Sequence, residues 1–107
     1  MKVVCLGKYT NDAWRGMIGS NFQERKSMMK QVCENAGARL IDIMFTRGEF
    51  DIMVTLDVPS EDIALGAVVA VNASGSVKEL CVLTEINMDK CLETARKVTG
   101  TYVPPGG

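Results

Sequence analysis

Residues 46–54 read TRGEFDIMV, and the arrangement of the sheet depends on how this stretch folds. Apolar and polar residues alternate on both sides of its first four residues, and this pattern predicts β-strands at 39–45 and 50–58. Gly48 can adopt the positive φ that a tight connection requires, since it has no side chain. The two strands are therefore predicted to form an antiparallel hairpin closed by residues 46–49.

The register of this hairpin follows from its apolar residues, because residues that face each other across a sheet point to the same side. The residues expected to face the core are Ile41, Ile43, Phe45, Phe50, Ile52 and Val54. We therefore predict that Phe45 lies opposite Phe50 and that Met44 lies opposite Asp51. Phe50 is expected to pack beneath the helices.

The rest of the chain supplies two further strands and three helices. Strands are predicted at 3–6 and 77–85, and helices at 20–36, 60–72 and 87–98, while 10–19 is predicted as a loop or loose helix. Ser20 and Gln23 have the spacing of a capping box, and Ser60 and Asn87 are predicted N-caps. The order is β-α-β-β-α-β with a terminal helix. This predicts an α+β, ferredoxin-like fold with a four-stranded antiparallel sheet, in one domain at 1–99 followed by an irregular tail at 100–107.

Composition narrows the classes of partner. The chain has 107 residues, a net charge of −1, and Lys and Arg residues that form no run. Nucleic acids and anionic membranes attract basic patches, so neither is an expected partner. The longest apolar stretch, 64–71, is too short to cross a bilayer, and residues 1–9 do not resemble a signal peptide. We expect a cytoplasmic protein.

Histidine is absent, which removes the commonest general base and the commonest metal ligand. Nucleophile schemes that pair serine or cysteine with histidine are therefore excluded within one chain. The four cysteines have no CxxC spacing and are expected to be reduced thiols that form no metal site. No cofactor is expected.

The second face of the sheet is predicted to be partly apolar and partly acidic. Its expected residues are Leu40, Asp42, Met44, Asp51, Met53, Thr55, Asp57, Cys81 and Leu83. The helices cover the first face, so this surface would leave a large apolar patch in water, which monomers generally avoid. We predict a homodimer, or a higher homo-oligomer, in which such faces pack together and can leave a cavity for a small molecule.

Several short segments resemble the GYD domain family. They are LGKYT at 6–10, TRGEFDIMV at 46–54, VPSED at 58–62 and GSVKELCVLTEI at 75–86. The Gly-x-Tyr-Asp-type segment of the family reads Gly48-Glu49-Phe50-Asp51 here, with phenylalanine in place of tyrosine. The resemblance spans about 3–98 and implies a ferredoxin-like fold of the dimeric α/β-barrel type. It implies little about activity.

Five residues are candidates for a ligand-binding site: Tyr9, Trp14, Met44, Asp51 and Met53. Asp51 could act as an acid or base in a closed cavity, or it could be an ordinary charge at a strand entry. Tyr9 and Trp14 could frame a pocket or could cover the end of the core.

Three functions remain open from the sequence. The first is a non-catalytic, homodimeric binding or scaffold module. The second is a cofactor-free dimeric-barrel enzyme that acts on a small carbonyl or aromatic substrate, with Asp51 as the acid-base. The third is a regulatory subunit that covers the sheet edge or helices of another protein.

Overall fold

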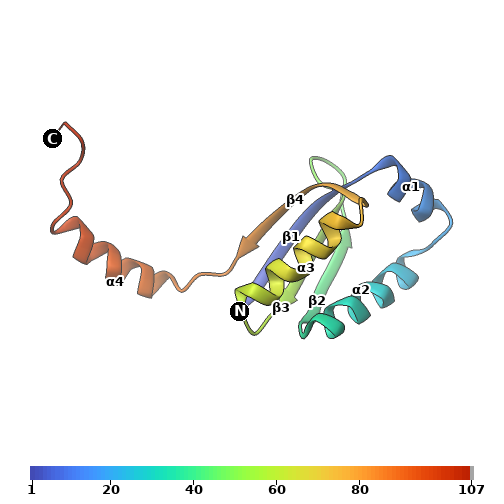
Figure 1. Cartoon of the computed structure of the whole chain (residues 1–107), viewed down its shortest axis with the longest axis horizontal. Coiled ribbons are helices and arrows are strands. Elements are labelled where there is room, and N and C mark those ends of the chain that lie inside the picture. The colour runs from blue at the N-terminus through green and yellow to red at the C-terminus, as the bar shows by residue number, and fades with distance from the viewer. Residues whose placement is uncertain (107) are drawn as a thin grey trace.

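The computed structural model describes residues 1–106 and confirms the α+β, ferredoxin-like prediction. One four-stranded antiparallel sheet has the order β2-β3-β1-β4, with helices α2 and α3 along one face (Figure 1). The elements are β1 Lys2–Tyr9, α1 Asn11–Ile18, α2 Phe22–Ala36, β2 Arg39–Phe45, β3 Ile52–Asp57, α3 Glu61–Ala73, β4 Val77–Thr84 and α4 Met88–Thr99.

The core lies between the sheet and the helices. Its buried members include Val3, Ile43, Val54, Leu56 and Ala64. The alternating apolar residues of β3 point toward the helices, as predicted, because a strand projects successive side chains to opposite faces. Helices α2 and α3 thus cover the first face, and no helix of the described residues covers the other face.

The predicted hairpin exists, but its register is wrong by two residues. Phe45 pairs with Ile52 and Met44 pairs with Met53, so residues 46–51 form the connection. Two hydrogen bonds hold this longer connection: Thr46 N–H donates to the Asp51 carbonyl, and Thr46 Oγ1 donates to the Phe50 carbonyl. A register shift of two residues leaves the residues of β3 on their predicted faces. Phe50 lies outside the core, and its ring centroid is 5.6 Å from Lys8 Nζ.

A β-bulge in β2 corrects a second prediction. The register with β3 shifts between Leu40 and Asp42, which places Leu40 opposite Leu56 and against the core. Ile41 is the extra residue and is exposed, although alternation had predicted it inside. A bulge inserts one residue into a strand and reverses the alternation on one side of it.

The helix ends differ from the predictions in some details. Residues 11–18 form a regular helix, which Thr10 caps by accepting a hydrogen bond from Ala13 N–H. The N-cap of α2 is Asn21, not Ser20, and its side chain accepts a hydrogen bond from Glu24 N–H. Ser60 makes no side-chain capping bond, whereas Asn87 caps α4 as predicted.

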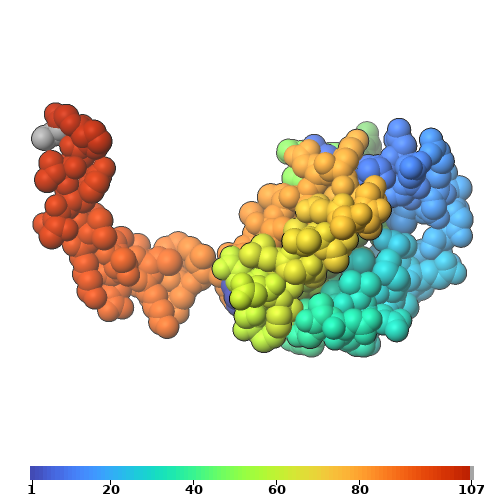
Figure 2. All heavy atoms as spheres, viewed as in Figure 1, coloured from blue at the N-terminus to red at the C-terminus, as the bar shows by residue number. Residues whose placement is uncertain are grey.

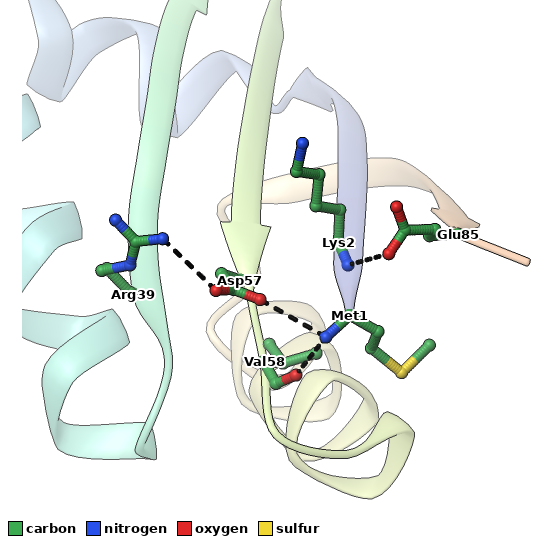
Figure 3. A network of polar contacts seen from close by, with 6 residues as sticks. All are labelled: Met1, Lys2, Arg39, Asp57, Val58 and Glu85. Atoms are coloured by element: carbon green, nitrogen blue, oxygen red, sulfur yellow. Dashed lines mark hydrogen bonds and ion pairs between the residues drawn. The ribbon is translucent and has the colours of Figure 1, made fainter.

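A polar network ties the chain start to the ends of three strands (Figure 3). The terminal ammonium donates to the Val58 carbonyl and pairs with Asp57, which also accepts from Arg39. The hydrogen bond from Arg39, then that from the terminal ammonium, lowers the pKa of Asp57 below its usual value. Lys2 N–H donates to the side chain of Glu85, the residue after β4. The beginnings of β1 and β2 and the ends of β3 and β4 therefore lie together at one end of the sheet.

Candidate functional site

The uncovered face of the sheet carries a continuous apolar row across all four strands. Met44 pairs with Met53, Met53 pairs with Leu6, and Leu6 pairs with Cys81. A neighbouring row runs through Asp42, Thr55, Val4 and Leu83. These eight side chains share one side because paired residues project to the same face. We call this surface the open face.

The open face is exposed in the single chain. Met44 has 44% of its surface in water and Leu83 has 53%, while Met53, Leu6 and Cys81 are half-buried by their neighbours. No helix of residues 1–106 lies over it. A contiguous apolar row of this kind is typical of a surface that another molecule covers.

Asp51 has a structural contact that the sequence did not reveal. It is the last residue before β3, and its Oδ2 accepts a hydrogen bond from Tyr9 N–H at 2.9 Å. Its own N–H donates to the Gly7 carbonyl at 2.8 Å. The residue thus joins the end of β1 to the start of β3, since both bonds satisfy backbone groups at the strand ends.

Replacing Asp51 with alanine is expected to lower the free energy of unfolding by about 1–3 kcal/mol, because Tyr9 N–H loses a charged acceptor. Asparagine keeps an acceptor oxygen in the same place, so the free energy of unfolding should fall clearly less in D51N than in D51A. Urea denaturation of the three proteins measures the difference. If D51A and the parent unfold at the same urea concentration, Asp51 has no structural role.

Tyr9 and Trp14 lie on the opposite, helix-covered side, within an aromatic cluster. The Tyr9 ring is buried, with its centroid 5.5 Å from Trp14 and 6.3 Å from Phe45. Phe22 meets Phe45 edge-on at 6.0 Å. Such aromatic pairs stabilise a fold beyond their buried area. Tyr9 therefore belongs to the core, and Trp14, which is 40% exposed, covers the end of it.

A pocket of about 370 Å³ opens beside this cluster, between α1 and the start of α2. It is lined by Tyr9, Ala13, Gly16, Met17, Ser20, Arg25 and Ser76. The Arg25 Nε is buried and has no hydrogen-bond partner within residues 1–106, and none of their ion pairs includes Arg25. A guanidinium in this state can bind an anion that enters the pocket.

Sequence reasoning missed Arg25. It stands in the segment Glu24-Arg25-Lys26, where charges are expected on the solvated face of a helix. No motif marks it, since it joins the pocket only because residues from distant parts of the chain line the same hollow.

The structure does not gather the five predicted site residues into one place. Met44 and Met53 lie on the open face, Tyr9 and Trp14 lie beside the pocket, and Asp51 lies at the strand ends between them. A site that used all five would have to span both sides of the sheet edge.

The cysteines are all free thiols within the described residues. Burial is the main cause that raises the pKa of Cys5, with smaller contributions from Cys33 and Cys81. Burial likewise raises the pKa of Cys33. A raised pKa keeps a thiol protonated and unreactive, so these two cysteines are structural.

None of the helices in residues 1–106 has both the length and the apolar character needed to cross a bilayer. Comparison with curated proteins finds no significant match to the chain. The sequence model of the GYD domain matches residues 3–95, which include all of the sheet except Lys2, the helices α1 to α3 and most of α4. The chain therefore belongs to the GYD domain family.

Proposed function

We propose that this protein is a homodimeric binding module whose subunits pack together through the open face. The observation that carries the proposal is the apolar row of Met44, Met53, Leu6 and Cys81, which is continuous across the sheet and uncovered. Two such faces would pack about 10 Å apart. The polar side chains of Asp42 and Thr55 lie beside the row, and they leave room for a small molecule between the subunits.

Size-exclusion chromatography with light scattering tests the dimer. The expected mass is twice that of the 11.6-kDa chain. A particle of 11.6 kDa at micromolar concentration would rule out the proposal. The four free thiols further support a reducing compartment such as the cytoplasm, since oxidising compartments favour disulfides.

The pocket beside Tyr9 supports small-molecule binding as part of the same function. Its volume is within the range of ligand sites, and the unpaired Nε of Arg25 favours a small carboxylate. Benzoate is a suitable probe, with uncharged benzyl alcohol as its matched control. Trp14, the only tryptophan, reports binding because its ring contacts Tyr9.

Benzoate is expected to change Trp14 fluorescence saturably, and R25Q should weaken its binding by about 10- to 100-fold, since a charge-assisted hydrogen bond is lost. Benzyl alcohol should bind weakly to both proteins. Equal affinity of the parent and R25Q for benzoate would remove the pocket from the proposal while leaving the dimer in place.

A dimeric-barrel enzyme with Asp51 as its acid-base is the alternative function. Asp51 Oδ2 accepts from Tyr9 N–H, and this contact supports the structural role instead. The binding module is therefore the function that we propose.

A further inference from the structure

Helix α4 extends away from the rest of the molecule. It follows β4 after a short connection, Glu85 to Asn87, and all of its residues are exposed (Figures 1 and 2). The radius of gyration is 17.8 Å, compared with about 13 Å for a compact domain of this length. An isolated helix of 12 residues is marginal in water, so α4 requires a surface to pack against.

Both α4 and α3 have an apolar face that no other part of residues 1–106 covers. The stripe on α4 consists of Met88, Cys91, Leu92, Ala95 and Val98, which recur at helical spacing. The outer face of α3 is formed by Leu65, Gly66, Val69, Ala70 and Ala73, and Val69 is 66% exposed. The helices have 12 and 13 residues and are therefore about equally long.

Charge at the helix ends determines how these faces can meet. α3 begins with Glu61 and Asp62, and α4 ends with Arg96 and Lys97. An antiparallel arrangement brings these opposite charges together and opposes the two helix dipoles. A parallel arrangement would instead place Asp89, in the first turn of α4, beside the acidic start of α3.

The chain path makes the antiparallel arrangement impossible within one molecule. Val58 N–H donates to the Met1 carbonyl, and Glu85 N–H donates to the Lys2 carbonyl. Helices α3 and α4 therefore both start at the same end of the sheet (Figure 1). If α4 folded back over its own α3, the two helices would run parallel. We therefore propose that α4 of each subunit docks antiparallel along α3 of a second copy of the chain. This exchange rests on the proposed homodimer, because the dimer supplies the second copy.

A charge-reversal pair tests the exchange. One variant carries R96E and K97E in α4, and the other carries E61K and D62K in α3. Either homodimer brings like charges together at both docked ends, whereas the heterodimer restores opposite charges at both. After mixing, native mass spectrometry should find heterodimers at about three quarters of all dimers or more, above the random half. If heterodimers make up only half of all dimers, as random mixing gives, the exchange is wrong and the open-face dimer remains possible.

A cross-linking experiment on the unmodified sequence keeps the proposal testable if a variant fails to fold. Protein labelled with ¹⁵N is mixed with unlabelled protein and treated with an amine-reactive cross-linker. Antiparallel docking places Lys90 near Lys78 of the other copy. Within one chain the two lysines are far apart, because Lys78 is at the start of β4 and Lys90 is in α4, which extends away from the end of that strand. A cross-link between Lys78 and Lys90 whose two peptides carry different isotopes joins two chains and supports the exchange. If Lys90 links only within single chains while the parent is dimeric, the exchange is wrong. If the parent is monomeric, the proposed function fails as well.

Discussion

Replacing Met44 with glutamate is expected to convert the dimer into single chains of 11.6 kDa. Met44 is at one end of the apolar row on the open face and is 44% exposed, so the isolated subunit tolerates a charge there. A two-fold interface contains the new glutamate of both subunits, and each of the two charges loses its hydration without gaining a partner of opposite charge. Loss of an important interface contact costs about 2–4 kcal/mol, which weakens the dimer at least about 30-fold.

The matched control is I18E, which adds the same charge in α1, where Ile18 is 85% exposed and lies away from the open face. I18E should remain dimeric. Light scattering over a range of concentrations gives the dissociation constants, and circular dichroism shows whether each variant is folded. A folded M44E that dimerises as tightly as I18E would show that the subunits do not meet through this surface.

The sequence predicted the sheet well because strand alternation is a local signal. Every core residue of β3 was assigned to its correct face, since a register error of two leaves the alternation intact. The bulge at Ile41 was not predictable, because it depends on how β2 curves along its neighbour. The position of Asp51 was missed for a similar reason, since its partner, Tyr9 N–H, is distant in sequence and is brought near only by the sheet.

The candidate site was less predictable than the fold. Tyr9 and Trp14 were expected either to frame a pocket or to cover the end of the core, and the structure shows that the Tyr9 ring is part of the core. The pocket next to it is lined partly by Arg25, whose Nε is buried, and its other lining residues come from distant parts of the chain. The apolar stripe of α4 was visible in the sequence, yet its spacing is the same for a helix that packs on its own sheet and for one that packs elsewhere.

Replacing Tyr9 with alanine is expected to lower the free energy of unfolding by about 3–5 kcal/mol. The ring is 4% exposed and contacts both Trp14 and Phe45, so its removal leaves a cavity and ends two aromatic contacts. The total free energy of unfolding of a small domain is about 5–15 kcal/mol. Y9A should therefore lose a large part of its stability and be partly unfolded at ordinary temperatures. Urea denaturation followed by far-ultraviolet circular dichroism measures the loss without using Trp14.

Y9F separates the two roles that Tyr9 has in the structure. Phenylalanine keeps the ring that packs in the core but removes the hydroxyl group, and with it a polar group of a residue that lines the pocket. We expect Y9F to unfold within about 1 kcal/mol of the parent, since no buried ring contact is lost. If Y9A is as stable as Y9F, the ring is not a core element, and the aromatic cluster does not hold the end of the sheet. If Y9F instead loses as much stability as Y9A, the hydroxyl group is the stabilising element, and the packing argument for this cluster is wrong.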